Sequence, residues 1–522
     1  MLDPGQILDG SYLNALANEH AIAFSSVIAP SRPPETTILW GTICSGGEGV
    51  AFVMKALGKL YADMGVKPRF VHRFSCEVKP SLQDFILAVK HEAGDTTTDG
   101  APEGDMQFCL FERAEDMGKP FAKCVRHSKL CPVPRVDLLI FGTSCKDLSR
   151  ASNVYKSSML VMNMQVSTGG SAQTFGGAEA YLLKHAVDLI LFENSDALDD
   201  AGDLTSQQTN LQIVECRLQN IGFVLKVFLM DSSLFGLPQC RRRYYITGVK
   251  DGAATNVDFS DRSAAAVLDV TENLVRLCQR KPPCASKLLL DEDDPAIDHE
   301  LNRRLAMGDT DSRYNVCAAI STFQGAGLSW GSVDAQRDTQ ESPWYTTLAN
   351  GQRNVLTYSE AQDKEAMFRD IGQSSSRVRF SHKVEDKHIL FCQMPGQLVW
   401  VRRDGKLPRL QMGREALIFQ GYPIASIPST VSAVSERMLQ EIAGNMMSIP
   451  VLLALLQSLF AALPWRGHST STIIHTSEHD VDEAMAIYTS LTSSNVDTTD
   501  TPPQKRLRRL KMNRASGSTG DD

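Results

Sequence analysis

The sequence predicts a doubly wound α/β sheet accompanied by a second, smaller and less regular domain. From about residue 37 to 250, short apolar runs alternate with amphipathic segments, which is the pattern of strands and helices in such sheets. From 251 to 405 this pattern gives way to polar stretches that contain Gly and Ser, such as STFQGAGLSWGSVDAQ. A chain of 522 residues is too long for one compact core, so two domains are expected.

Six apolar runs are the candidate strands of the sheet. Each is followed by a loop or by a stretch with helical periodicity. The runs are TTILWGTIC, RFVHRFSCE, VDLLIFG, VDLILFE, FVLKVFLM and RYYITGV. Helical periodicity returns late in the chain, in GREALIFQGYP and in SERMLQEIAGNMMSIPVLLALLQSLF.

The two ends of the chain have a different character. Residues 1–36 precede the first candidate strand as an N-terminal extension, and residues 466–522 form a Ser/Thr-rich tail that is expected to be disordered.

The net charge of −8 excludes a generally basic surface for nucleic acid, so any such charge must be local. The apolar stretch IPVLLALLQSLFAAL is too short and too interrupted to span a bilayer, so we expect a soluble, intracellular protein without membrane contact.

Twelve cysteines are scattered without paired spacing, which fits a reducing compartment better than a disulfide framework. Cys124, His127 and Cys131 have the residue types of a zinc site. Three ligands with no fourth nearby make a weak site, so no metal is expected.

The first two strands end in residues suited to binding a cofactor. The first ends in CSGGEG, and a Gly-rich turn at the carboxyl end of such a strand lets a ligand approach the backbone closely. The spacing differs from the dinucleotide pattern G-x-G-x-x-G, and a turn without a ligand is equally compatible with it. The second strand ends at Glu77, whose carboxylate would accept hydrogen bonds from both hydroxyls of a ribose. Exposed glutamates are common at strand ends, so Glu77 alone proves little.

Two further strands bring a thiol and a carboxylate to the same edge. Cys145 follows the strand VDLLIFG by three residues, and Glu193 and Asn194 end the strand VDLILFE. A cysteine and a glutamate at one sheet edge can act as nucleophile and acid partner. Core cysteines are usually inert, so Cys145 depends on that partner for a catalytic role.

Basic residues lead into the last strand. Gln239, Arg241 and Arg243 occupy alternate positions, so their side chains are expected on one face. Buried as a row, the two guanidinium groups would require anions or carboxylates as partners. An exposed basic strand edge is the alternative.

Taken in this order, the motifs resemble those of the cytosine-5 methyltransferases, over residues 37–250 and 405–460. CSGGEGVAFVMKALG is similar to the first family motif, with Cys44 in place of the Phe that usually covers the adenine. TSCKDLS is similar to the Pro-Cys motif, and its ending is most similar to that of the eukaryotic de novo DNA enzymes. ENS stands for Glu-Asn-Val, and PQCRRR matches Gln-x-Arg-x-Arg. PRLQMGREALIFQGYP and AGNMMSIPV are similar to the last two motifs.

The resemblance implies a Rossmann-like, S-adenosyl-L-methionine-dependent methyltransferase domain over 37–250, completed by 406–465, with 251–405 as target-recognition domain. DNA is the implied partner, and its target cytosine is flipped out of the duplex. The implied catalytic residues are Cys145, Glu193, Asn194, Arg241 and Arg243. The implied cofactor-binding residues are Cys44, Ser45, Gly46, Gly47, Glu48, Glu77, Val78, Glu112 and Asn445.

The family mechanism assigns a role to each catalytic group. The Cys145 thiolate attacks ring position 6 of cytosine, while Glu193 holds the protonated ring nitrogen 3. Arg241, and less certainly Arg243, hold the base carbonyl and Glu193 in place and lower the pKa of the thiol.

Three positions depart from the family pattern. Ser144 replaces Pro and gives up a fixed φ before the nucleophile, and Ser195 replaces Val beside the acid. Glu48 adds a carboxylate to the cofactor turn, which would either favour a cationic sulfonium or repel the carboxylate of the cofactor. None of these changes removes a group that the chemistry requires.

Positive charge gathers locally in residues 377–411, where eight Lys and Arg face three acidic residues. This excess is typical of a DNA-binding surface, although a solvated loop is the alternative. The expected DNA contacts are Arg377, Arg379, Lys383, Arg402 and Arg403.

Two other functions stay open at this stage. A transfer-RNA cytosine methyltransferase of the same fold is less expected, because SCKDLS lacks the Cys-Phe-Thr signature of those enzymes. A catalytically weak regulatory homologue is conceivable because of Ser144, but retention of Cys145, Glu193 and Arg241 weighs against it.

The basic cluster KRLRRLK in the tail predicts nuclear import, with a non-specific nucleic-acid arm as the alternative. The sequence does not identify protein partners.

Overall fold

The computed structural model describes most of the chain up to residue 465. Ser45 and the tail 466–522 lie outside the described residues, so the predictions made for them are not addressed by the fold. The described ranges are 10–27, 37–44, 46–66, 68–92, 107–148, 170–200, 208–250, 259, 262–307, 316–329, 335–374, 377–426 and 434–465.

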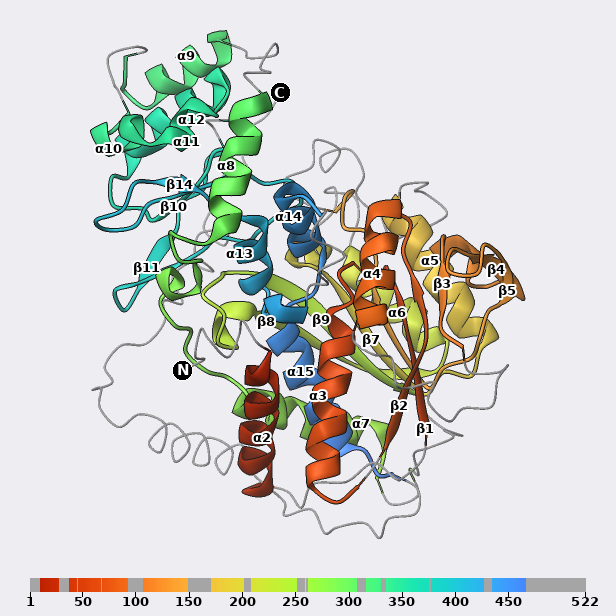
Figure 1. Cartoon of the computed structure of the whole chain (residues 1–522). Helices are drawn as coiled ribbons and strands as arrows, with labels where there is room; N and C mark the ends of the chain where they lie inside the picture. The colour runs from red at the N-terminus through yellow and green to blue at the C-terminus, as the bar shows by residue number, and fades with distance from the viewer. Residues whose placement is uncertain are drawn as a thin grey trace, which may run out of the picture. The chain divides into compact units, whose positions relative to one another are not determined.

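A nine-stranded sheet forms the centre of the described chain, in the order β5-β4-β3-β2-β1-β6-β7-β9-β8 (Figure 1). Strands β3, β2, β1, β6 and β7 are parallel, whereas β9 runs antiparallel between β7 and β8. All six apolar runs form strands, which confirms the predicted doubly wound sheet. The strands are β1 (Thr37–Ile43), β2 (Arg69–Cys76), β3 (Cys109–Phe111), β4 (Phe121–Cys124), β5 (Lys129–Pro132), β6 (Leu138–Gly142), β7 (Leu189–Ser195), β8 (Phe223–Asp231) and β9 (Arg242–Lys250).

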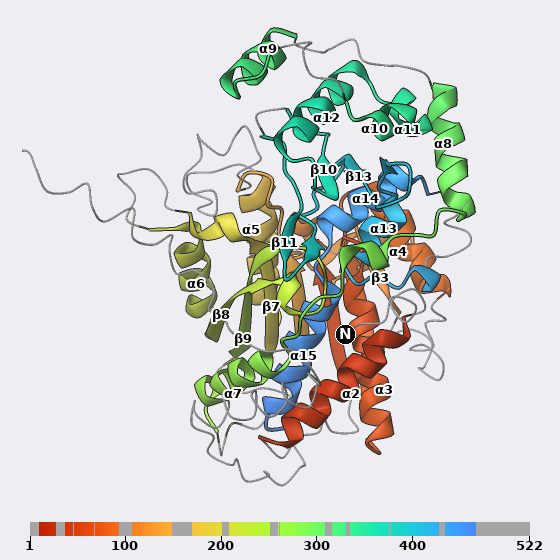
Figure 2. The same cartoon turned by 90° about the vertical axis from the view of Figure 1, so that its left-hand side faces the viewer.

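Helices cover both faces of this sheet, as the two views in Figures 1 and 2 show. One face carries α5 (Gly170–Lys184) and α6 (Asn210–Asn220). The opposite face carries α3 (Gly49–Asp63), α4 (Pro80–Glu92), α7 (Ala264–Leu277) and α15 (Ile449–Ala462). The N-terminal extension contributes α2 (Ser11–Ser25), which packs against α3, α7 and α15.

Helix α15 is the central helix of this second layer. All fourteen of its residues are buried, because α2, α3 and α7 pack around it. Together with α14 (Glu436–Asn445) it forms a stretch that is long and apolar enough to cross a membrane by length and composition alone. Since 89% of the most apolar window of this stretch is buried inside the protein, packing accounts for its composition.

Aromatic packing fixes the two strands that carry the predicted nucleophile and acid. Phe141 of β6 and Phe192 of β7 contact each other with ring centroids 5.1 Å apart, and Phe175 of α5 packs edge-on against Phe192. All three rings are fully buried. Truncating such a side chain to Ala typically lowers the free energy of unfolding by about 3–5 kcal/mol. The loop after β6 and the end of β7 are therefore attached to a well-packed part of the core.

The segment predicted as the smaller domain begins with α7, but this helix packs on β8, β9 and α15 and so belongs with the large sheet. The rest consists of short elements, including a three-stranded sheet β10-β13-β14 and the hairpin β11-β12. The helix α13 (Gly413–Ile418) then leads into α14. The short elements are α8 (Pro295–Met307), α9 (Val316–Gly325), α10 (Arg337–Glu341), α11 (Pro343–Thr346), α12 (Asn350–Gln362), β10 (Phe368–Asp370), β11 (His382–Val384), β12 (Lys387–Ile389), β13 (Val399–Val401) and β14 (Arg409–Leu410).

Candidate active site

Most of the predicted site residues lie at the edge of the large sheet that is formed by the carboxyl ends of its parallel strands. The carboxyl ends of β1, β2, β3, β6 and β7 meet there because these strands are parallel, and antiparallel β9 begins there. A small cavity opens at this edge. Its lining includes Cys44 after β1, Gly142 of β6, Glu193 of β7 and Asn445 at the end of α14. The structure therefore places residues of the predicted cofactor site next to the predicted acid.

The Gly-rich turn after β1 packs directly against the end of α14. Gly46 has a φ of +57°, and a Cβ atom there would lie 3.0 Å from the backbone oxygen of Asn445. A Cβ atom at Gly47 would lie 2.6 Å from the Ile442 side chain. Only glycine fits both positions without displacement. The late segment that contains Asn445 thus returns to the turn, as the sequence predicts.

Glu77 lies just beyond β2 and braces the same turn. Its Oε2 accepts a hydrogen bond from the backbone N–H of Gly46 at 3.2 Å, and its Oε1 accepts one from the N–H of Lys79 at 3.1 Å. Burial raises the pKa of the Glu77 carboxyl, while these hydrogen bonds oppose that rise. The neighbouring Val78 is 64% exposed, which leaves an apolar surface beside the carboxylate.

Two residues of the predicted cofactor set have other partners. The carboxylate of Glu48 is fully buried and accepts hydrogen bonds from Thr42 Oγ1 at 3.0 Å and Ser75 Oγ at 2.5 Å. It faces the core beneath the turn, so its predicted contact with the cofactor is corrected to a supporting role. Glu112 follows β3 and forms an ion pair of 2.6 Å with Lys123 on β4.

The loop that carries Cys145 is tied to the end of β7. Asn194 donates from Nδ2 to the backbone oxygen of Thr143 at 3.2 Å and to Thr143 Oγ1 at 3.0 Å, and its Oδ1 accepts from the N–H of Ser195. The amide of Asn194 is buried and already bonded at both ends. We therefore correct its predicted catalytic role to that of a residue that positions the loop.

The substitution at Ser144 creates a hydrogen bond that proline would lack. The backbone N–H of Ser144 donates to Thr174 Oγ1 at 3.1 Å, in the first turns of α5. Two residues after the thiol, Asp147 accepts a hydrogen bond from the N–H of Ser171 at 2.9 Å. The start of α5 therefore holds the loop on both sides of Cys145, which offsets the loss of a fixed φ.

The two arginines at β9, which were expected to share one role, have different partners. Arg243 pairs with Glu193, with 3.3 Å between Nε and Oε1. Arg241 instead donates to the backbone oxygens of Gln393 at 3.1 Å and Met446 at 2.8 Å. Arg241 lies just before β9. Its guanidinium group contacts backbone carbonyl groups from the segments that contain Gln393 and Met446. Arg241 joins the late segments, and Arg243 is the partner of the acid.

Burial dominates the protonation of the reactive groups. It raises the pKa of the Cys145 thiol, and the nearby guanidinium groups of Arg243 and Arg241 oppose that rise without cancelling it. The two arginines thus lower the pKa of the thiol, as predicted, but burial outweighs them and the pKa is raised. Burial also raises the pKa of Glu193, again against Arg243. A carboxyl group with a raised pKa keeps its proton closer to neutral pH, which suits it to hold or donate one.

A second cysteine lies at the site and was missed by the sequence analysis. Arg243 Nη2 lies 3.4 Å from the Sγ of Cys392. Burial alone would raise the pKa of Cys392, but the guanidinium groups of Arg243, Arg241 and Arg379 outweigh burial and lower it. No sequence signal connects Cys392 to Cys145, because it comes from the segment between β12 and β13.

The predicted DNA contacts are largely paired within the protein. Arg379 binds Asp370 at 2.7 Å, and Arg402 binds Asp338 at 2.6 Å. Arg403 forms an ion pair with Glu292. Only Arg377 and Lys383 of the predicted five are exposed. The local excess of positive charge is thus partly neutralised by acids that lie elsewhere in the sequence, which corrects the predicted surface.

The sheet order and the cavity at the carboxyl ends of its parallel strands define a Rossmann-like α/β domain. The family model described as C-5 cytosine-specific DNA methylase matches residues 123–461, which is more than half of the chain. The chain therefore belongs to the C-5 cytosine-specific DNA methylase family.

Two curated relatives carry the name DNA (cytosine-5-)-methyltransferase DMT5. The protein from Cryptococcus neoformans is 26% identical over 448 residues, which cover 79% of this chain and 16% of the relative. The protein from Verticillium dahliae is 23% identical over 473 residues, which cover 79% of this chain and 19% of the relative. The chain thus spans less than a fifth of the length of either relative.

Solved structures also resemble the chain, at a greater distance. The crystal structure of the S. pombe Dnmt2 methyltransferase matches 81% of this chain and 98% of its own, with 13% identity and a TM-score of 0.40. This likeness supports no conclusion beyond those already drawn.

Proposed function

We propose that the chain transfers a methyl group from S-adenosyl-L-methionine to carbon 5 of cytosine in DNA. The observation that carries the proposal is the juxtaposition of the Cys145 loop, the buried Glu193–Arg243 pair and the cavity beside the Gly-rich turn. The names of the two curated relatives favour DNA over RNA as the substrate.

The residues around the cavity fit the methyl donor. Cys44 and Asn445 line the cavity, and Glu77 offers a carboxylate at the end of the second strand for ribose hydroxyls. Exposed Val78 provides apolar surface next to it. When bound, S-adenosylmethionine supplies an electrophilic methyl group.

The side chains at the edge would then activate the base. The Cys145 thiolate forms a bond from Sγ to ring position 6, while Glu193 provides the proton or hydrogen bond that ring nitrogen 3 requires. The added electron density makes position 5 nucleophilic toward the methyl group. Loss of the proton from position 5 then allows the bond between Sγ and position 6 to break, which restores the thiolate. Since a paired base is unreachable, the cytosine must leave the duplex.

Methyl transfer measured with tritiated S-adenosylmethionine, on DNA and on RNA side by side, tests this function. We expect incorporation into DNA. Cys145→Ala should reduce turnover more than about a thousandfold, as loss of a nucleophile does, while cofactor binding stays near that of the wild type. Cys216→Ser is the matched control, because Cys216 is exposed on α6 and outside the site.

Two outcomes would contradict the proposal. Label that enters RNA and not DNA would reassign the substrate, and a Cys145→Ala variant that retains more than about a thousandth of the activity would exclude covalent catalysis. DNA that contains 5-fluorocytosine gives an independent check. Fluorine replaces the proton that must leave, so a covalent complex with Cys145 should accumulate.

We also propose that the chain works in the nucleus. The support is the cluster KRLRRLK from Lys505 to Lys511, whose five basic residues suit recognition by the import machinery. An enzyme that modifies chromosomal DNA in a eukaryote needs such access.

A further inference from the structure

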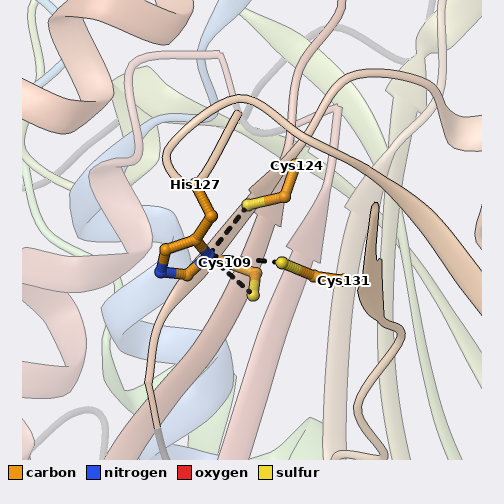
Figure 3. Close-up of side chains that lie close together, drawn as sticks. All are labelled: Cys109, Cys124, His127 and Cys131. Atoms are coloured by element: carbon orange, nitrogen blue, oxygen red, sulfur yellow. Dashed lines mark hydrogen bonds between the residues drawn. The ribbon is translucent and has the colours of Figure 1, made fainter. Parts of the chain in front are cut away.

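A cluster of four side chains lies at the far edge of the sheet, away from the cavity. Cys109 begins β3, Cys124 ends β4, Cys131 lies in β5, and His127 lies in the turn between β4 and β5. Figure 3 shows the three sulfur atoms around one nitrogen of the imidazole ring. The sequence offered three of these residues, and the expectation of no metal rested on the lack of a fourth ligand. Cys109 supplies it from another strand.

We propose that Cys109, Cys124, His127 and Cys131 bind one zinc ion. The Nδ1 of His127 lies 3.7 Å, 3.3 Å and 3.4 Å from the Sγ atoms of Cys109, Cys124 and Cys131. All four ligand atoms lie within 4.8 Å of one another. Bonds of about 2.3 Å to sulfur and 2.0–2.1 Å to nitrogen at a tetrahedral angle separate the ligand atoms by about 3.6 Å. The observed spacing matches such a shell.

Hydrogen bonding alone does not account for this convergence. An imidazole Nδ1 carries either one hydrogen or one lone pair, so it can form a hydrogen bond with only one of the three thiols at a time. The three sulfur atoms belong to buried residues, with exposed fractions of 8%, 0% and 4%. A metal ion gives all four atoms one common partner.

The ligand set selects the metal. Three cysteines and one histidine are typical of structural zinc, since soft thiolates disfavour magnesium and calcium. The four side chains supply a complete set of four ligands, none of them a carboxylate, and the three cysteines are buried. The site is therefore structural in kind.

The position of the cluster explains what the ion would do. The ladder between β3 and β4 registers one residue pair, Phe111 with Cys124, and β4 and β5 form a hairpin at the sheet edge. A shared ion would fasten this hairpin to β3, whose next residue, Glu112, pairs with Lys123 of the hairpin.

Metal analysis of the full 522-residue chain tests the inference without any assay of activity. After dialysis against EDTA, elemental analysis should find about one zinc ion per chain in the wild type. The Cys124→Ser/Cys131→Ser variant should retain almost none. Cys216→Ser, which removes an exposed thiol outside the cluster, should retain the wild-type amount.

Cobalt substitution keeps the test valid if the double variant fails to fold. Co²⁺ in the wild-type chain should give the thiolate charge-transfer band and the intense visible bands of a tetrahedral site with sulfur ligands. Zinc content below about a tenth of an equivalent in the wild type, with octahedral cobalt spectra, would overturn the proposal. So would a folded double variant that keeps its zinc, or a disulfide between two of the cluster cysteines found by mass mapping of the protein purified under native conditions.

Discussion

Removing the hydroxyl group of Thr174 should loosen the loop that carries the nucleophile. The N–H of Ser144 donates to Thr174 Oγ1 at 3.1 Å, in a position where the family has proline and no N–H. A neutral hydrogen bond contributes about 1 kcal/mol, which corresponds to roughly a fivefold loss of rate if the bond holds the reactive geometry. Thr174 Oγ1 also donates to the backbone oxygens of Gly170 at 2.8 Å and Ser171 at 3.1 Å, so Thr174→Val alone removes these contacts as well.

A double-mutant cycle separates the contact with Ser144 from those within α5. Ser144→Pro has no N–H to lose, so Thr174→Val should cost only the contacts with Gly170 and Ser171 in that background. The two changes should therefore couple by about 1 kcal/mol. Single-turnover methyl transfer to a DNA duplex, measured for the wild type, both single variants and the double variant, gives this coupling directly. A coupling energy below about 0.3 kcal/mol would mean that the effects simply add, and that Ser144 and Thr174 do not hold the loop together.

Three further predictions concern the cofactor, the thiol and the tail. Glu77→Ala should raise the KM for S-adenosylmethionine about tenfold or more, as loss of a charged hydrogen-bond acceptor does. The KM for DNA should stay nearly unchanged in initial-rate measurements, and an equal rise of both KM values would indicate misfolding. Arg243→Gln removes a charge that lowers the pKa of Cys145 against burial, so the rise of activity with pH should move to the alkaline side. An unmoved profile would show that Arg243 acts by packing alone. Deleting residues 501–522 should move a fluorescent fusion out of the nucleus while activity on naked DNA is kept, whereas unchanged location with a weaker salt dependence of DNA binding would identify an electrostatic arm.

The sequence predicts the parts of the fold and the site that depend on local pattern. Apolar runs identify the long strands, and their order along the chain brings Glu77, Cys145 and Glu193 to one edge. The apolar pattern does not identify strands β3, β4 and β5, because segments of three or four residues are too short to show the alternation of a strand. The alternation at β9 indicates the face on which Arg241 and Arg243 lie. It does not indicate which of them meets a carboxylate.

Partners from distant segments account for what the sequence could not predict. Cys109 and the other three members of the metal cluster meet through sheet pairing, and spacing along the chain gives no sign of it. The acids that neutralise Arg379, Arg402 and Arg403 come from other elements, so counting charges in one segment overstates its positive potential. Glu48 was placed in the correct turn, but the backbone geometry of the turn directs its carboxylate into the core.

The burial of α15 on all sides has a consequence for biosynthesis. About 400 residues separate the end of β1 from Ile449, a length that a ribosome adds in roughly 20–80 s at typical speeds. During that interval the apolar surfaces of α2 and α3, and of α7 once it is made, lack the helix that later fills the space between them. The nascent chain therefore carries an unfilled core until α15 emerges, and it should depend on chaperones that shield apolar surface during this time.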